Sequence, residues 1–516
     1  MFAKVLTATP QGVGALFVTV EVDRRQSAHP GLAIVGLPDA AVRESKERVL
    51  AALRRIGPPP EPANVVVNLA PAEERKEGAG LDLAIAVGLL ATRGVVPSDS
   101  VGGTLLLGEL SLEGRLLPVR GVLPIALAAR DRGIARIVLP AGNATEAAVV
   151  EGVEILLART LAELVLHLRG ERLLPPAEPR PVGRHHLPAG PDLVDVIGQE
   201  QARRALEIAA AGGHHTLLIG PPGSGKSMLA RRLPGILPPL EHHEALETTS
   251  VHSVSRRVPR PDGLLSVRPF RAPHHTVSAA ALIGGGTNPQ PGEISLAHNG
   301  VLFLDELTEF RRDVLESLRQ PLEDRRVTIS RARRSLTFPA RFQLIAAANP
   351  CPCGFLGDSQ RSCRCTPRQI ERYRARLSGP LLDRIDLQVQ VPAVPWRELG
   401  AHRRGEPSAA VAGRVRAARE RQRSRFGPDG PLCNAELGPA EIATWCEPPE
   451  EAAALLERAA RTLGLTARAY HRILRVARTI ADLEGAETLA VHHVAEAVAY
   501  RVLDRGRESA PAAAVQ

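Results

Sequence analysis

The residues best suited to do chemistry lie in one glycine-rich segment near the middle of the chain. Residues 215–219 before this segment predict a buried strand, and residues 227–233 after it predict a helix. In that context backbone N–H groups close around phosphate oxygens at a helix N-terminus, a lysine reaches the β- and γ-phosphates, and a hydroxyl holds Mg²⁺. The segment matches the pattern G-x-x-x-x-G-K-[ST] in full, with Gly220, Pro221, Pro222, Gly223, Ser224, Gly225, Lys226 and Ser227. The sequence therefore predicts a site for ATP and Mg²⁺.

Polar side chains follow two later apolar runs. Residues 300–304 lead into Asp305 and Glu306, and residues 342–348 lead into Asn349. Asp305 is expected to hold Mg²⁺ through water, and Glu306 to polarise the water that attacks the γ-phosphate. Asn349 is expected to position that water. Any one of these residues alone would be typical of a protein surface, but three in this order after a P-loop indicate a nucleotide-hydrolysing core.

Four of the six cysteines fall within fifteen residues, in the pattern C-x-C-x9-C-x-C. In a cytosolic protein such a cluster favours a metal site over disulfides, and four thiolates suit tetrahedral zinc. The predicted zinc ligands are Cys351, Cys353, Cys363 and Cys365. The paired C-x-C spacing is less usual than C-x2-C, so a packing role stays open. Cys433 and Cys446 are interpreted as packing residues.

Three further segments indicate a family. They read RPFRAPHH at residues 268–275, PGEISLAHNG at 291–300 and SGPLLDRID at 378–386. With the P-loop they resemble the magnesium chelatase-like ComM/YifB family of AAA+ ATPases over essentially the whole chain. The resemblance implies a closed head-to-tail hexamer. It also implies that Arg384 is the arginine finger, which reaches the neighbouring subunit's ATP, and that Arg468 is the sensor 2 arginine. In so arginine-rich a chain, a surface or capping role is the alternative for each.

Residues 326–338 alternate as a β-hairpin does and carry a basic tip at Arg331, Arg333 and Arg334. A guanidinium can bind two phosphate oxygens at once, so these side chains suit contacts with a DNA backbone. The segment resembles the pre-sensor hairpin of chelatase-type and replicative-helicase AAA+ proteins, which points into the pore and grips nucleic acid. A solvated turn is the alternative.

The first part of the chain resembles a Lon protease-like domain, most clearly at residues 106–121. Lon proteases use a Ser–Lys dyad. Here the region of the serine, residues 76–80, contains no serine, and the helix expected to carry the lysine, residues 121–130, contains no lysine. Without nucleophile and base we expect no peptidase activity, and we interpret the domain as an inactive scaffold for DNA binding or ring assembly.

The expected fold class is α/β, in three domains joined by one linker. Residues 1–170 predict a Lon protease-like α+β domain, with strands at 16–22 and 64–69 and helices at 38–55 and 81–90. Residues 171–191 are a proline-rich linker, 192–395 an AAA+ core of magnesium chelatase type, and 396–516 a helical lid. Within the lid, residues 411–425 predict an exposed helix rich in Arg and Glu.

Composition limits the partners. The net charge is +9 and the sequence pI is about 9.8, which suggests a polyanion, although GC-rich codon usage explains part of the arginine excess. Aromatic residues make up only 3%, so contacts with backbone phosphates are more plausible than extensive base stacking. No apolar run has the length of a membrane span, and the start of the chain is strand-like instead of a signal peptide, so we expect a cytoplasmic protein without a membrane partner.

Three functions follow from these observations. The leading hypothesis is a hexameric ATP-driven motor on single-stranded or branched DNA. By family resemblance, such a helicase promotes branch migration in homologous recombination during natural transformation, with recombination proteins as further partners. The second is a motor subunit for magnesium insertion into porphyrin, against which stand the extra Lon-like domain and the absence of a D-x-S-x-S motif. The third is a non-translocating AAA+ scaffold or chaperone.

Overall fold

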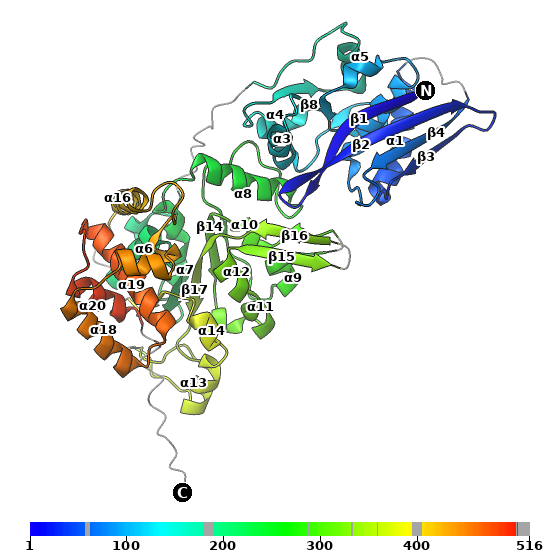
Figure 1. The fold of residues 1–516 in the computed structure, drawn as a ribbon. Coiled ribbons are helices and arrows are strands. Elements are labelled where there is room, and N and C mark those ends of the chain that lie inside the picture. Colours follow the sequence, from blue (N-terminus) through cyan, green and yellow to red (C-terminus); the bar gives the residue numbers. More distant parts are fainter. Residues whose placement is uncertain are drawn as a thin grey trace.

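The computed structural model describes residues 1–56, 62–178, 190–286, 288–331, 334–358, 360–394, 405–501 and 503. These residues form a mixed-sheet domain, a parallel-sheet core and a bundle of helices that packs beside the core (Figure 1). This is the predicted α/β class. No described helix is long and apolar enough to cross a membrane.

The first domain is built on a seven-stranded sheet in the order β3-β4-β2-β1-β5-β8-β9. Strands β1, β2 and β4 pair antiparallel, and β5, β8 and β9 pair parallel. The sheet strands are β1 (Phe2–Gln11), β2 (Gly14–Gln26), β3 (Gly31–Val35), β4 (Ala63–Ala70), β5 (Thr104–Leu106), β8 (Arg136–Pro140) and β9 (Glu154–Ala158). A separate small pair is β6 (Glu109–Leu110) and β7 (Leu116–Leu117). The strands predicted at 16–22 and 64–69 are confirmed in β2 and β4.

The helices of this domain are α1 (Ala40–Leu53), α2 (Asp82–Ala91), α3 (Val122–Asp131), α4 (Ala144–Ala147) and α5 (Leu161–Leu168). The predicted helices at 38–55 and 81–90 correspond to α1 and α2. All ten residues of α2 are buried, as its almost wholly apolar sequence requires. After α5, the first part of the predicted linker lies along β9: the N–H of Leu157 donates to the carbonyl of Pro175 at 3.0 Å. Residues 179–189 of that linker lie outside the described residues.

The core is a five-stranded parallel sheet in the order β11-β14-β17-β10-β18. Its strands are β10 (Thr216–Ile219), β11 (Phe270–Arg271), β14 (Gly300–Leu304), β17 (Phe342–Ala348) and β18 (Leu387–Gln390). Every residue of β10, β14 and β17 is buried, as expected for a parallel sheet covered on both faces. Two antiparallel pairs lie outside the sheet, β12 (Gly284–Gly285) with β13 (Gln290–Pro291) and β15 (Arg326–Arg331) with β16 (Arg334–Pro339).

The helices of the core are α6 (Glu200–Gly212), α7 (Lys226–Arg232), α8 (His242–Val254), α9 (Ala279–Ile283), α10 (Glu293–Leu296), α11 (Arg312–Ser317), α12 (Arg319–Asp324), α13 (Pro367–Arg374) and α14 (Gly379–Leu382). The bundle consists of α16 (Ser408–Phe426), α17 (Pro439–Trp445), α18 (Glu450–Leu463), α19 (Ala467–Glu484) and α20 (Val491–Ala499).

The prediction of an exposed helix at 411–425 is wrong for one face of α16. Val411, Val415, Ala418 and Gln422 are buried there, and Gln422 Nε2 donates to the carbonyl of Ala211 at 3.0 Å. The buried stripe is made of small apolar residues and one amide. Its signal in the sequence is therefore weak beside the many arginines of the other face.

The first domain docks on α8 of the core. The N–H of Gly121 donates to the carbonyl of Ser253 at 3.3 Å, and the Ser253 hydroxyl donates to the buried carboxylate of Glu146. Burial raises the pKa of Glu146, although the hydrogen bond from Ser253 opposes that shift. Ala245 and Leu264 of the core join the hydrophobic cluster of the first domain. The contact therefore combines apolar packing with a buried hydrogen-bonded acid.

One buried ion pair ties the bundle to the sheet. Asp386, directly before β18, accepts hydrogen bonds from Arg472 Nη1 of α19 at 2.5 Å and from the N–H of His215 at 3.1 Å. Burial alone would raise the pKa of Asp386, but Arg472 and the neighbouring His214 outweigh burial and hold the pKa well below its usual range. Asp386 therefore stays ionised within the protein at neutral pH.

We predict that Arg472→Met lowers the free energy of unfolding at pH 7 by about 3–5 kcal/mol, because Asp386 stays buried without its cation. Without Arg472 the pKa of Asp386 rises, so the penalty is present at high pH and is lost as the carboxyl group takes up a proton. The gap between variant and wild type should therefore shrink from pH 7 to pH 5 in urea unfolding. The exposed pair Arg461–Glu457 supplies the control: Arg461→Met should change stability by less than about 1 kcal/mol at both pH values. A gap that widens on acidification would contradict this role of Asp386.

Candidate nucleotide-binding site

The predicted P-loop joins β10 to α7 at the carboxyl edge of the core sheet. A Cβ atom at Gly220 would lie 2.0 Å from the carbonyl oxygen of Val391, so only glycine fits there. Gly223 and Gly225 have φ angles of +78° and +92°, which side chains rarely adopt. The loop therefore has the backbone that the pattern requires, and α7 begins at Lys226, one residue before the predicted helix start.

Several polar groups of the P-loop lie where a phosphate and a cation would be bound. Lys226 Nζ donates to the carbonyls of Gly220 at 2.7 Å and Pro221 at 2.8 Å. Burial lowers the pKa of Lys226, and the carboxylates of Asp305 and Glu306 oppose that shift. The buried Ser224 hydroxyl has no hydrogen-bond partner among the described residues. An ammonium that the loop carbonyls hold beside the P-loop and a buried hydroxyl without a hydrogen-bond partner both suit contacts with phosphate oxygens.

The predicted Mg²⁺ ligands meet directly. Ser227 Oγ donates to Asp305 Oδ2 at 2.5 Å, although 78 residues separate them. A hydroxyl and a carboxylate at this spacing fit a shared Mg²⁺ ion, which prefers oxygen ligands. Asn349 Oδ1 lies 3.4 Å from Lys226 Nζ. The structure thus brings Lys226, Ser227, Asp305 and Asn349 together at one edge of the sheet.

Glu306 lies beside this group with its side chain 56% exposed. Its φ is +52°, in the left-handed region, and its Oε2 lies 3.3 Å from Nδ1 of His275. We did not predict His275 as a site residue, although it closes the RPFRAPHH segment. Gln199 was also missed. Its Nε2 donates to the carbonyls of Ser224 at 3.2 Å and Pro392 at 2.6 Å, so it ties the P-loop to the end of β18. An isolated glutamine gives no sequence signal for such a role.

Arg384 and Arg468 do not join this group. Arg384 is buried, and it donates from Nη2 to Glu323 Oε1 at 2.5 Å and from Nη1 to the carbonyl of Pro380 at 2.6 Å. Arg468 is exposed at the start of α19, one turn from Arg472, which donates to the carbonyl of Arg384 at 3.0 Å. The two arginines thus lie near each other, on the side of the sheet where β18 begins.

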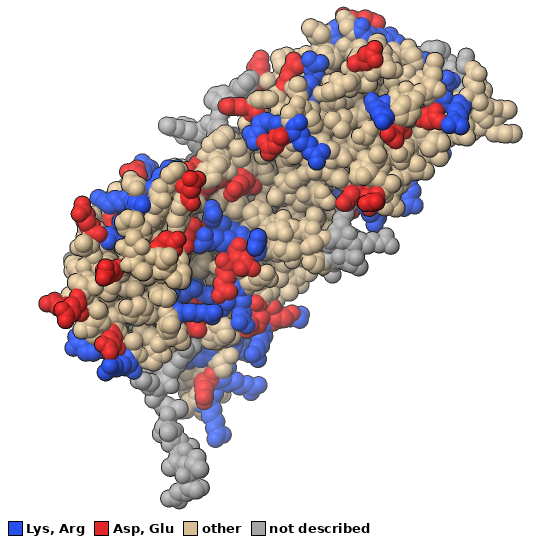
Figure 2. Space-filling view, in the orientation of Figure 1, with Lys and Arg blue, Asp and Glu red and all other residues tan. Residues whose placement is uncertain are grey.

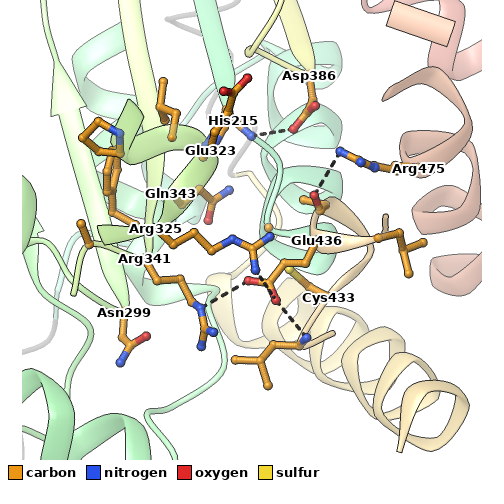
Figure 3. Close-up of a pocket in the computed structure, with 18 of the residues that line it drawn as sticks. His215, Asn299, Glu323, Arg325, Arg341, Gln343, Asp386, Cys433, Glu436 and Arg475 are labelled. Atoms are coloured by element: carbon orange, nitrogen blue, oxygen red, sulfur yellow. Dashed lines mark hydrogen bonds and ion pairs between the residues drawn. The ribbon is translucent and has the colours of Figure 1, made fainter. Parts of the chain in front are cut away.

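Arg468 lines a cavity of about 410 Å³ that His215, Gly300 and Phe342 also line. Figure 3 shows this cavity with His215 labelled. Gly300 and Phe342 begin β14 and β17, and His215 directly precedes β10. The cavity therefore opens at the amino edge of the parallel sheet, whereas the P-loop lies at its carboxyl edge. The seven residues of β17 alone separate the two edges by about 20 Å.

Most charges in this amino-edge cavity are paired. The Glu436 carboxylate forms ion pairs with Arg325 at 3.0 Å and Arg341 at 3.4 Å (Figure 3). Arg475 Nη1 donates a hydrogen bond to the carbonyl of Ala435 at 3.3 Å. Burial lowers the pKa of His215 to about 4, which keeps its ring neutral at physiological pH. Basic and acidic side chains intermix along the hollow between bundle and sheet (Figure 2).

The four predicted zinc ligands come together just past Asn349. Their sulfur atoms all lie within 4.8 Å of one another, and Cys351 Sγ is 3.4 Å from Cys353 Sγ and 3.7 Å from Cys363 Sγ. Four sulfurs around a tetrahedral zinc ion are roughly 3.8 Å apart. Backbone N–H groups of Phe355 and Arg364 lower the pKa of Cys353 to about 6, which favours its thiolate. The donor set fits zinc.

The predicted hairpin is confirmed as β15 and β16. Their register runs from Arg326 opposite Pro339 to Arg331 opposite Arg334. Val327, Ile329, Leu336 and Phe338 anchor one face in the core. Arg333 lies outside the described residues, as do the side chains of Arg331 and Arg334. Their contact with DNA stays a prediction.

Comparisons with known proteins decide the family. The family model described as magnesium chelatase, subunit ChlI, matches residues 192–399, its C-terminal counterpart matches 405–501, and subunit ChlI of Mg-chelatase matches 20–143. Competence protein ComM of Haemophilus influenzae is 45% identical over 511 residues, which cover 98% of each chain. YifB of Escherichia coli is 44% identical over 500 residues, which cover 97% of each chain.

The chain belongs to the ComM/YifB family of magnesium chelatase-like AAA+ proteins. Two more distant matches bear on its parts. Lon protease 2 of Bacillus subtilis is 28% identical over 186 residues, about a third of each chain, in keeping with the predicted Lon-like fold. The magnesium-chelatase 38 kDa subunit of Cereibacter sphaeroides is 27% identical over 171 residues, 30% of this chain and 51% of that one. The alignments with ComM and YifB thus cover nearly the whole chain, whereas the alignment with the chelatase subunit covers 30% of it.

We predict that Lys226→Ala and Glu306→Gln both abolish ATP hydrolysis, for different reasons. Lys226→Ala removes the cation nearest the phosphates and should weaken nucleotide binding. Glu306→Gln keeps the P-loop intact, so it should bind ATP like the wild type and fail to turn it over. Nucleotide titration and phosphate release measure the two effects. Glu309→Gln, a nearby exposed glutamate, is the control and should behave as wild type. Wild-type turnover in Glu306→Gln would contradict its assigned role.

Proposed function

We propose that this protein is a hexameric ATP-driven DNA motor, a helicase of the kind that promotes branch migration in homologous recombination. The observation that carries the proposal is the attachment of the basic hairpin to the nucleotide site. Strand β16 ends at Pro339 and β17 begins at Phe342, so only two residues separate the hairpin from the strand that ends beside Asn349. A change at the γ-phosphate can therefore be transmitted along one strand to Arg331, Arg333 and Arg334.

Within one subunit, Lys226 and the P-loop N–H groups bind the phosphates of ATP, and Ser227 and Asp305 hold Mg²⁺. Bound Mg²⁺ neutralises charge on the phosphates. Glu306 orients and polarises the attacking water, and Asn349 positions it against the γ-phosphate. The Glu306 carboxylate now faces His275, so it must turn from that partner to act on water.

Arg384 and Arg468 act on the ATP of the next subunit. Both lie at the amino edge of the sheet, so in a head-to-tail ring this edge faces the neighbour's carboxyl edge. Arg384 must leave Glu323, whose side chain is 48% exposed and is readily solvated when released. The guanidinium then stabilises charge on the transferred phosphoryl group.

The four-cysteine centre holds a structural zinc ion in this proposal. The first domain serves as an inactive scaffold. Lys76, its only lysine near the former serine position, is buried and donates to the carbonyl of Pro71, and α3 contains no lysine. The cytoplasm and the DNA recombination machinery follow as expected location and partners, in keeping with the name competence protein carried by one relative.

A second candidate is a motor subunit for metal insertion into a porphyrin. It is favoured by the match of the core to the magnesium chelatase model. A second model, described as subunit ChlI of Mg-chelatase, matches residues 20–143 of the first domain. Against this candidate stands the extent of the relatives: ComM and YifB align with nearly the whole chain, whereas the chelatase 38 kDa subunit aligns with 30% of it. A non-translocating scaffold is the third candidate. ATPase rates with single-stranded, duplex and branched DNA, beside porphyrin with Mg²⁺, separate the three.

We predict that changing Arg331, Arg333 and Arg334 together to Ala weakens DNA binding similarly for all sequences, because phosphates carry no base code. The log–log salt dependence of binding should flatten by roughly one unit per lost phosphate contact. Basal ATPase should survive, while DNA stimulation and strand displacement should fall.

The matched control changes Arg416, Arg458 and Arg461 to Ala, three exposed arginines of α16 and α18. This variant loses the same charge far from the hairpin and should keep wild-type stimulation. Equal losses of DNA affinity and DNA stimulation in the two variants would mean that the change in net charge, and not the hairpin, causes the effect. A hairpin variant with unchanged affinity, salt slope and stimulation would contradict the hairpin as the DNA grip.

A further inference from the structure

A second cavity, of about 450 Å³, adjoins the P-loop. Pro222, Gly223, Ser224 and Gly225 form its inner wall, so it begins where the phosphates of a bound nucleotide would end. Its volume lies in the range of small-molecule sites. Because a nucleotide held by its phosphates must place its sugar and base beside the P-loop, this cavity is the room available to them.

Two sides of this cavity are apolar. Val196 and Ile197 come from the segment before α6, and Met228 and Leu229 come from α7. Met228 is 44% exposed and lines the cavity, so its side chain is accessible to a ligand there. A flat base lying over these side chains would cover them.

A further part of the wall comes from the loop between the two cysteine pairs, of which the structure describes residues 354–358 and 360–362; this described part is called here the inter-cysteine loop. Phe355, Asp358, Gln360 and Arg361 line the cavity from this loop. The guanidinium carbon of Arg361 lies 5.1 Å from the centre of the Phe355 ring, so cation and ring stack on one another. The loop thus adds an aromatic ring and a cation to the apolar residues that line the cavity.

The inter-cysteine loop is held against the P-loop at its start. Gly354 is buried with φ +84°, and a Cβ atom there would lie 2.6 Å from Cδ of Pro222. Its N–H donates to the carbonyl of Cys351 at 2.9 Å. Further along, Asp358 Oδ1 accepts from the N–H groups of Gln360 at 2.7 Å and Arg361 at 2.8 Å. In the sequence the loop follows Cys353 directly and ends directly before Cys363, so it connects the two cysteine pairs.

We propose that Phe355 and Arg361 form the nucleoside-binding wall of the ATP site, and that metal held by the four cysteines positions this wall. Phe355 stacks on the base and Arg361 backs the ring. The inference rests on the proposed function, because it assigns the base-side contacts of the same ATP site. It makes the cysteine centre a determinant of nucleotide affinity and separates binding of the nucleoside from binding of the phosphates.

The test measures binding of ADP by calorimetry and of inorganic tripolyphosphate by competition, in the full chain. Phe355→Ala should weaken ADP binding about 5- to 150-fold, the range for loss of one base–aromatic stack. Arg361→Ala should weaken it less. Tripolyphosphate, which has no base, should bind both variants like the wild type. Leu356→Ala in the inter-cysteine loop and Arg364→Ala between Cys363 and Cys365 are the controls, since neither residue lines the cavity. Both variants should bind ADP normally.

The metal half of the proposal has its own readout. Zinc content is measured by elemental analysis, and zinc is then removed from the wild type and from Phe355→Ala with a chelator. Removal should weaken ADP binding in the wild type, have little further effect in Phe355→Ala, and leave tripolyphosphate binding unchanged in both.

Each other outcome is decisive. Normal ADP affinity in both Phe355→Ala and Arg361→Ala would contradict the assignment of these residues to the nucleoside-binding wall, and it would leave the ATPase proposal intact. Absence of metal from the purified protein, or loss of tripolyphosphate binding on zinc removal, would overturn the positioning role of the metal. A wild-type protein that binds neither ADP nor tripolyphosphate would instead overturn the proposed function itself.

Discussion

All five strands of the core sheet run in the same direction, and this constraint determines where the proposed catalytic groups that flank the strands lie. Groups that follow strands collect at the carboxyl edge, which is why Ser227 and Asp305 come within 2.5 Å of each other. Arg384 precedes β18 and so lies at the amino edge, and Arg468, at the start of α19, lines the cavity that opens at this edge. A single copy of the chain cannot bring both sets to one nucleotide. The proposed ring follows from this separation as much as from the family.

The carboxyl end of β17 is the point where the proposed activities connect. At its start this strand continues from the basic hairpin, and at its end it leads to Asn349 and then to Cys351 within two residues. The residues proposed for DNA contact, water positioning and metal binding therefore share one short stretch of chain. The four cysteines thus lie close to the proposed nucleotide site, and two residues separate the hairpin from the strand that leads to this site.

The sequence could predict what depends on local pattern. The P-loop, the residues after β14 and β17, the hairpin, and the strands at 16–22 and 64–69 and helices at 38–55 and 81–90 of the first domain have short-range signals of spacing and apolar alternation. The structure places Lys226, Ser227, Asp305 and Asn349 together as those signals suggest.

What the sequence could not predict depends on contacts between distant segments. The pairing of His275 with Glu306 and the burial of Arg384 against Glu323 join residues with no shared motif. The buried face of α16 was missed because its outward arginines dominate the composition. The position of the inter-cysteine loop beside the P-loop depends on how two loops meet at a sheet edge, which spacing alone does not reveal.

The most direct test of the shared ATP site mixes two inactive variants. Arg384→Ala should bind ATP but lose a factor of about 10³–10⁵ in turnover, since an arginine finger contributes that much. Lys226→Ala keeps its arginine but binds nucleotide poorly. When the two are mixed and subunit exchange is verified, intact P-loops should meet intact arginines at mixed interfaces, and ATPase activity should reappear. A mixture that exchanges subunits and stays inactive would contradict a nucleotide site completed by the neighbouring subunit.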